Sequence, residues 1–154
     1  MGWETSESRN FLQKIYTAGG GGYFDVVAIH PYVHPETGGM AALRRFVRDT
    51  RAVMNVNSDS RPIWLTEIGW PTAVDAWGGP TVSEAQMGQW VTTAIGDCSG
   101  LGAGVDRAYW YSFRDTAIDQ SDLENSFGLV RFDLEPKPAS FAFRRLADSA
   151  NCDP

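Results

Sequence analysis

Four side chains that can act as nucleophile, hydrogen-bond donor or stacking platform lie at or near the ends of apolar runs. Glu67 closes the run over residues 62–68, and a carboxylate there is costly to bury unless it has a function. His30 ends the preceding run and Tyr32 follows it, and Trp110 lies within the next one. Tyr32 can donate its hydroxyl group to Glu67, which favours the ionised carboxylate that a nucleophile needs. The pattern therefore predicts a nucleophilic carboxylate at Glu67 with Tyr32 and His30 beside it.

Each of these residues also has an ordinary structural explanation. Glu67 could be an exposed carboxylate beyond a strand end or the partner of a cation, and a single histidine is more often structural than catalytic. Trp110 could belong to the core, which must account for most of the aromatic residues that form 12% of the sequence. Aromatic faces also stack on sugar rings, and Trp70 and Trp77 lie in a loop where they could do so. The convergence of several such groups at strand ends is what favours a site.

The elements that must position these residues alternate between helices and strands. Helical periodicity predicts helices over residues 3–18, 40–55, 83–98 and 138–150, and short apolar, β-branched runs predict strands over residues 23–30, 62–68 and 106–112. Ser83 is expected to cap the third helix, with Gln86 three residues later. This order is typical of parallel strands joined by crossover helices.

The connections that follow the strands are long and rich in Trp, Tyr, Pro and Gly, whereas those that precede them are mostly turn-formers. That asymmetry is typical of a (β/α)8 barrel, whose site lies at the C-terminal ends of its strands. A doubly wound open sheet has the same order of elements and stays an alternative. No glycine fingerprint for a phosphate or a dinucleotide follows a strand.

Side-chain alternation assigns Glu67 to one face of its strand. Ile63, Leu65 and Glu67 should share that face, because side chains alternate along a strand. In the next strand Trp110 is in phase with Ala108. If the face of Glu67 is the barrel interior, its carboxylate points into the mouth, with Trp110 at the corresponding height.

Composition limits the partners. The 154 residues have a formal net charge of −6, which argues against nucleic acid or an anionic membrane and leaves a neutral sugar open. No apolar run is long enough to span a bilayer, and residues 1–4 lack the basic and apolar regions of a signal peptide, so the compartment stays open. Cys98 and Cys152 lack the spacing of a metal site and are either separate thiols or a disulfide between neighbouring helices.

Residues 63–72, Ile-Trp-Leu-Thr-Glu-Ile-Gly-Trp-Pro-Thr, resemble the strand that carries the nucleophile in retaining glycosidases of the large (β/α)8 superfamily, the cellulase-like and xylosidase-like families. Residues 25–32, Asp-Val-Val-Ala-Ile-His-Pro-Tyr, resemble the strand before it, where those families place a His-x-Tyr pair. Residues 109–113 resemble their last strand, with its substrate-stacking Trp. The resemblance implies a single domain over residues 1–154 that forms the C-terminal part of such a barrel. The parent families are often secreted.

The resemblance implies a role for each candidate residue and no metal or organic cofactor. Glu67 would attack the anomeric carbon of a β-linked carbohydrate, assisted by Tyr32 and His30. The expected substrate-binding residues are Trp110, Trp70 and Trp77. Retaining enzymes place two carboxylates about 5 Å apart, and these families usually hold the second one in an Asn-Glu pair at the end of the fourth strand. The sequence contains no Asn-Glu pair.

This departure leaves three interpretations open. Glu36, Asp75 or Asp115 on mouth-side loops could supply the acid, although each is more simply a solvated loop carboxylate. The chain could instead bind carbohydrate without turnover, or be an inactive half-barrel. Three parallel strands cannot close a barrel, so we expect a homo-oligomer formed through the exposed barrel edges.

Overall fold

The computed structural model describes residues 5–73, 81–96, 101 and 104–149. Seven regular elements lie in this part of the chain: α1 (Thr5–Thr17), β1 (Val27–Ile29), α2 (Gly39–Val56), β2 (Ile63–Ile68), α3 (Glu84–Ile95), β3 (Val105–Trp110) and α4 (Pro138–Ser149). Single 3-10 turns lie at Gly20–Gly22, Pro35–Thr37 and Leu123–Asn125. Trp77, Asp75, Cys98 and Cys152 lie outside the described residues. Ser83 caps α3 as expected, because its hydroxyl accepts a hydrogen bond from the backbone N–H of Gln86 at 3.1 Å.

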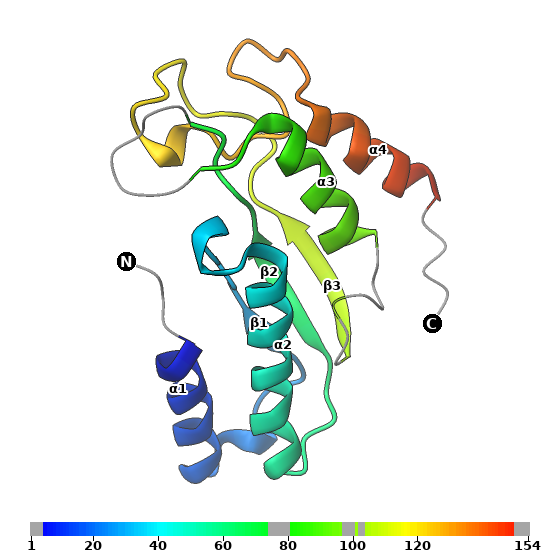
Figure 1. Cartoon of the computed structure of the whole chain (residues 1–154). Helices are drawn as coiled ribbons and strands as arrows, with labels where there is room; N and C mark the ends of the chain where they lie inside the picture. The colour runs from blue at the N-terminus through cyan, green and yellow to red at the C-terminus, as the bar shows by residue number, and fades with distance from the viewer. Residues whose placement is uncertain (1–4, 74–80, 97–100, 102–103, 150–154) are drawn as a thin grey trace.

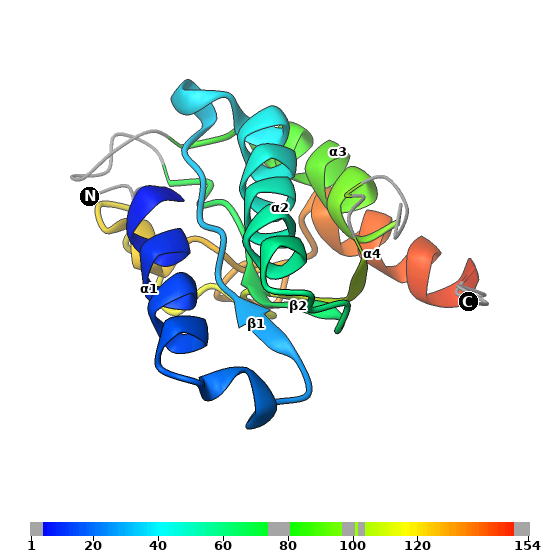
Figure 2. The ribbon, with the colours of Figure 1, turned by 90° about the horizontal axis from the view of Figure 1, so that it is seen from below.

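The three strands form one parallel sheet in the order β1-β2-β3. All four helices lie on one side of this sheet and form an arc (Figure 1). Figure 2 shows this arc in a view along the strands. A doubly wound sheet would carry helices on both faces. The one-sided arrangement therefore favours part of a barrel, whose helices form the outer ring.

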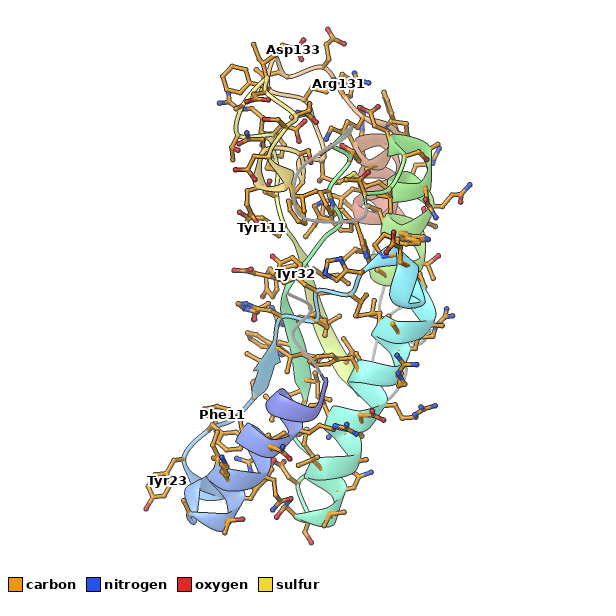
Figure 3. The ribbon with its side chains drawn as sticks, turned by 60° about the vertical axis from the view of Figure 1, so that its left-hand side comes forward. Phe11, Tyr23, Tyr32, Tyr111, Arg131 and Asp133 are labelled. Atoms are coloured by element: carbon orange, nitrogen blue, oxygen red, sulfur yellow. The ribbon has the colours of Figure 1, made fainter. Side chains whose placement is uncertain are left out.

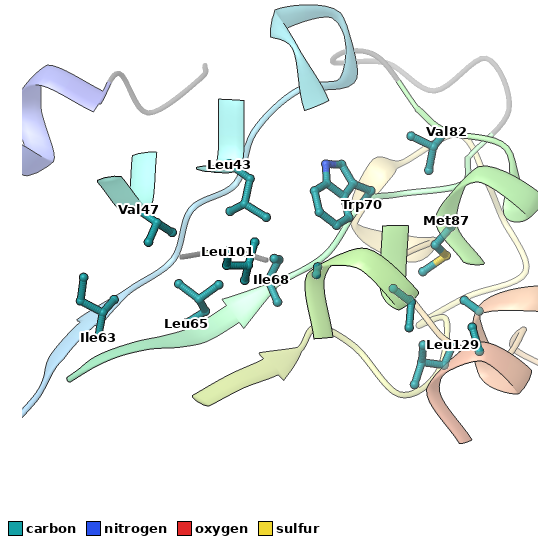
Figure 4. Packing of buried hydrophobic residues seen from close by; sticks show 14 of the residues in the cluster. Leu43, Val47, Ile63, Leu65, Ile68, Trp70, Val82, Met87, Leu101 and Leu129 are labelled. Atoms are coloured by element: carbon teal, nitrogen blue, oxygen red, sulfur yellow. The ribbon is translucent and has the colours of Figure 1, made fainter. Parts of the chain in front are cut away.

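The core lies between the sheet and its helices (Figure 4). Ile63, Leu65 and Ile68 of β2 are fully buried against Leu43 and Val47 of α2. Further buried members come from α3, from the loops after β2 and β3, and from α4: Trp70, Val82, Met87, Val91, Leu129, Ala139 and Ala142. No helix in the described part of the chain is long and apolar enough to cross a membrane.

The strict alternation expected along β2 is wrong at its C-terminal end. Ile63 and Leu65 face the helices, and so does Ile68. Ile68 lies three residues after Leu65, whereas strict alternation would place it on the other face. The register with β3 shifts between Leu65 and Ile68, where three steps along β2 match two along β3. This bulge places Glu67 on the face opposite Ile63 and Leu65, so the prediction that these three share a face fails.

A polar network closes the opposite end of the sheet, before β1, which is shorter than expected. The carboxylate of Asp59 accepts hydrogen bonds from the Tyr16 hydroxyl at 2.6 Å and from Nε of Arg61 at 2.8 Å. The guanidinium of Arg61 also donates to the carbonyls of Gly21 and Phe24. Of these two carbonyls, that of Phe24 lies within the expected strand, and it bonds to the Arg61 side chain rather than to β2.

Candidate active site

Glu67 and Tyr32 form the centre of the candidate site. The Tyr32 hydroxyl donates to Oε2 of Glu67 at 2.7 Å, as predicted. Nδ1 of His30 lies 3.5 Å from the same oxygen. The Glu67 side chain is 39% exposed, so a molecule in solvent can reach it. The ends of β1 and β2 therefore bring a phenol, an imidazole and a reachable carboxylate together.

The surroundings of Tyr32 keep its hydroxyl group protonated. Burial raises the pKa of Tyr32 far above its ordinary value, and the hydrogen bond to Glu67 and the negative charge of Glu67 raise it further. Tyr32 therefore stays a neutral donor throughout the physiological range. A smaller contribution comes from the charge of Glu124, an exposed residue of the 3-10 turn at Leu123–Asn125. The loop after β3 thus carries a carboxylate whose field reaches the site.

Two aromatic residues that the sequence pattern did not single out pack on Tyr32. Phe127 lies edge-on to it with ring centroids 6.0 Å apart, and Tyr111 does so at 6.3 Å. Tyr111 and Phe127 also contact each other at 5.5 Å. Figure 3 shows Tyr32 and Tyr111 together where the strands end. The signal for Tyr111 was its position directly after β3, which the assignment to Trp110 obscured.

The structure corrects the roles expected for Trp70 and Trp110. Trp70 is 1% exposed, and its indole N–H donates to the carbonyl of Val33 at 2.9 Å, so it presents no face to a sugar. Trp110 pairs in register with the buried Ile68, and its ring centroid lies 5.9 Å from that of Trp70. Its ring therefore belongs to the helix-covered side of the sheet, because the bulge in β2 changes which residues of the two strands are in phase.

Asp115 is neither a candidate acid at the mouth nor a solvated loop carboxylate. It is buried, and its Oδ1 accepts from Nζ of Lys137 and from the Gly128 amide, each at 2.8 Å. Lys137 also donates to the Thr72 hydroxyl at 2.8 Å and to the Ser126 carbonyl at 3.1 Å. The ion pair thus joins the loops that follow β2 and β3. Sequence spacing gave no sign of it.

Of the two cavities, one borders this centre and the other does not. Glu36 is exposed in the 3-10 turn after β1. A groove of about 770 Å³ between α1 and β1 includes His30 and Tyr32 in its lining. A cavity of about 690 Å³ beyond the strands, lined by residues such as Thr72, Asp115 and Arg131, includes neither. In the described part of the chain, no group of three His, Cys, Asp or Glu side chains is arranged to hold a metal ion.

Comparisons with known proteins agree on one class. The family model described as the glycosyl hydrolase catalytic core matches residues 1–128. The fold is similar to that of a family 39 glycoside hydrolase from Bacteroides cellulosilyticus WH2, with a TM-score of 0.62 and 21% identity over 90% of this chain. A thermostable mutant of the xylanase Xyn10A from Cellvibrio japonicus gives 0.65 and 16% over 94%. A GH5_18 protein from Bifidobacterium longum subsp. infantis gives 0.65 and 20% over 84%.

These solved structures are (β/α)8-barrel glycoside hydrolases, and the present chain spans only part of each. It covers 29% of the family 39 enzyme, 45% of the xylanase and 31% of the GH5_18 protein. Their identities are below 25%, so the likeness concerns the fold and not the substrate. No curated protein sequence matches the chain significantly. The three βα units therefore have the architecture of part of a (β/α)8 barrel.

Proposed function

The chain belongs to the glycosyl hydrolase catalytic core family, and from this premise we propose that Glu67 is the nucleophile of a retaining β-glycosidase site. The observation that carries the proposal is the 2.7 Å hydrogen bond from Tyr32 to Oε2 of Glu67 at the C-terminal ends of two parallel strands. Barrel enzymes place their catalytic groups at this end of the sheet. The substrate class is a β-linked carbohydrate, and no cofactor enters the scheme.

In this proposal the two oxygens of Glu67 have different tasks. Tyr32 and His30 both contact Oε2, which leaves Oε1 to attack the anomeric carbon. Attack forms the C–O bond of a glycosyl-enzyme and breaks the bond to the leaving group. Water then cleaves the glycosyl-enzyme. Tyr32 holds the carboxylate in one orientation through both steps.

The second carboxylate decides which substrates turn over. A general acid protonates the departing oxygen and later activates water. Without an Asn-Glu pair in the sequence, the nucleophile alone can expel only a leaving group that needs no proton. We therefore expect this chain to react with dinitrophenyl β-glycosides and to leave alkyl β-glycosides intact. Hydrolysis of the glycosyl-enzyme should be slow for the same reason.

A burst assay tests this proposal. Purified chain mixed with a panel of 2,4-dinitrophenyl β-glycosides should release one equivalent of dinitrophenol quickly and then turn over slowly. Azide, a nucleophile that needs no general base, should accelerate the slow phase and yield the β-glycosyl azide. Glu67→Gln removes the nucleophile at almost constant shape and should abolish the burst. A burst that persists in Glu67→Gln would refute the role of Glu67.

A second candidate function is carbohydrate binding without turnover. The lack of an Asn-Glu pair favours it, and Tyr111, which is partly exposed, supplies aromatic surface beside Tyr32. Binding of an oligosaccharide that is equal in the native chain and in Glu67→Gln, with no burst in either, would select this function.

The proposed partner, besides the carbohydrate, is a second copy of the chain. In the described sheet β1 and β3 are both edge strands, and the face opposite the helices exposes large side chains such as Tyr109. The groove between α1 and β1 is lined mainly by apolar residues, and Phe11 at its rim is 67% exposed. Paired edges between copies would bury this surface.

A further inference from the structure

Lys137 is a buried cation at the start of α4, 1% exposed, and it contacts three separate segments. Its Nζ donates to the Thr72 hydroxyl at 2.8 Å, to Oδ1 of Asp115 at 2.8 Å and to the Ser126 carbonyl at 3.1 Å. An ammonium group has three donors, so these contacts use its full capacity. Such a group orients three acceptors at once.

The three acceptors belong to the loops that carry the site. Thr72 lies five residues after Glu67 in the loop that leaves β2, and Asp115 lies in the loop that leaves β3. Ser126 directly precedes Phe127, and Asp115 also holds the amide of Gly128 at 2.8 Å. The Lys137–Asp115 pair therefore contacts the peptide units on both sides of Phe127, which Thr72 and Ser112 also hold through hydrogen bonds to the carbonyls of Ser126 and Phe127.

Stability alone does not account for this arrangement. Replacing a buried ion pair by apolar residues of similar volume is often neutral or stabilising, because burial removes both charges from water. A buried pair does define a single geometry for the groups it joins. The described residues that depend most directly on that geometry are Phe127 and the aromatic rings around it.

We propose that Lys137 is a positioning residue: by holding the turn around Phe127, it presses that ring against Tyr32 and so orients the Tyr32–Glu67 pair. Phe127 lies 6.0 Å from Tyr32 and 5.5 Å from Tyr111, and Tyr32 donates to Glu67 at 2.7 Å. The catalytic meaning of this arrangement rests on the proposed role of Glu67. The positional effect itself does not need a substrate.

Fluorine NMR of chain labelled with 3-fluorotyrosine tests the proposal without any turnover. The sequence has five tyrosines, and Tyr32→Phe identifies the signal at the site. Fluorination lowers the phenol pKa of every labelled tyrosine. In Lys137→Met, Phe127 should no longer shield Tyr32, so the Tyr32 midpoint should fall by about one pH unit or more. Glu67, Tyr111 and Glu124, which also act on Tyr32, are unchanged in this variant.

Tyr16 provides a matched internal control at the other end of the sheet. Burial and its hydrogen bond to Asp59 raise the pKa of Tyr16 to about 12. Lys137→Met should leave the Tyr16 midpoint in place, and Asp59→Asn should lower the Tyr16 midpoint and leave that of Tyr32. A general loss of stability would move both signals together in either variant.

Two further variants keep the test decisive if Lys137→Met unfolds. Thr72→Val removes one neutral acceptor and should shift the Tyr32 midpoint less, and Lys137→Met with Asp115→Leu removes both charges and should shift it as much as Lys137→Met. Lys137→Arg keeps the charge, so its Tyr32 midpoint should lie between those of Lys137→Met and the native chain. A folded double variant with an unchanged Tyr32 midpoint would overturn the proposal. If the native chain shows no burst with any glycoside but Lys137→Met still shifts the Tyr32 midpoint, the positioning role of Lys137 is supported. That result would contradict only the proposed glycosidase activity.

Discussion

The Tyr32 hydroxyl donates a hydrogen bond to one carboxylate oxygen of Glu67. The free energy of this hydrogen bond determines how much its removal should slow the reaction. A hydrogen bond to a charged group contributes about 1.5–3 kcal/mol. Tyr32→Phe removes the hydroxyl and keeps the ring that packs on Phe127 and Tyr111. We expect the rate of the dinitrophenol burst to fall about 10–100-fold if the full value is expressed in the transition state.

The control for Tyr32→Phe is a phenol outside this contact. Tyr23 is 89% exposed, so Tyr23→Phe should leave the burst unchanged. An unchanged burst in Tyr32→Phe would mean that Glu67 does not need the Tyr32 hydroxyl, and the proposed division of labour between its two oxygens would then be wrong.

The sequence predicted the residues of the site that lie at strand ends, and it failed for those that depend on a loop or a bulge. Glu67, Tyr32 and His30 follow directly from apolar runs, and two of them meet in a short hydrogen bond. Phe127 reaches the site only through its loop, which carries no periodic signal. Alternation along the strands favours Trp110 over Tyr111, because it cannot anticipate the extra residue in β2.

At the scale of the elements, the exits of β2 and β3 approach each other closely at Gly69. A Cβ atom on Gly69 would collide with the carbonyl oxygen of Tyr111 and lie 3.2 Å from the Phe127 ring. Gly69→Ala must therefore push the two strand ends apart. We expect a loss of about 1–3 kcal/mol in the free energy of unfolding, measured by urea denaturation, and a lower burst rate.

Gly22→Ala is the matched control for Gly69→Ala. Nothing lies within 4 Å of a Cβ placed on Gly22, so the same change of residue type should alter the free energy of unfolding by no more than about 0.5 kcal/mol. Equal effects of the two substitutions would show that the close approach of the strand exits is not tightly packed.

The network at the other end of the sheet should make stability depend on acid. Burial of Asp59 opposes its ionisation, but hydrogen bonds from Arg61 and Tyr16 outweigh burial and lower its pKa from 3.8 to about 2. The stabilisation is thus present above the ordinary pKa and is lost as the pH falls towards 2. The Asp59 side chain is 2% exposed, so a shift of nearly two units corresponds to about 2 kcal/mol.

Urea unfolding of the native chain and of Asp59→Asn between pH 2 and 6 measures this contribution. The difference in free energy of unfolding should be largest near pH 6 and should shrink as the pH falls below 4. Asp49→Asn removes a partly exposed pair with Arg9 and should cost less than about 1 kcal/mol. A difference for Asp59→Asn that does not change with pH would argue against the lowered pKa.

Most of the fold was predictable because each element has its own signal. The helices α2, α3 and α4 lie within a few residues of their expected bounds, and the parallel order of the strands is confirmed. β1 is shorter than expected, and within the expected strand the Phe24 carbonyl bonds to the Arg61 side chain. Periodicity could not reveal a contact between residues that lie about 40 positions apart.

At the scale of the whole molecule, the free edge of β1 offers a specific way to test association. In a parallel pair, alternate residues direct their backbone groups to opposite neighbours. Val27 donates its N–H to the carbonyl of Pro62, next to β2, so the N–H of Ala28 points to the open side. Ala28→Pro removes that donor and leaves the bonds to β2 in place.

If copies pair through this edge, the native chain should form an oligomer that dissociates on dilution, and Ala28→Pro should give the 16.9 kDa monomer. Ala28→Thr keeps the donor and should associate as the native chain does. Multi-angle light scattering at micromolar concentration distinguishes these results, and a native chain that is monomeric there would exclude pairing between copies.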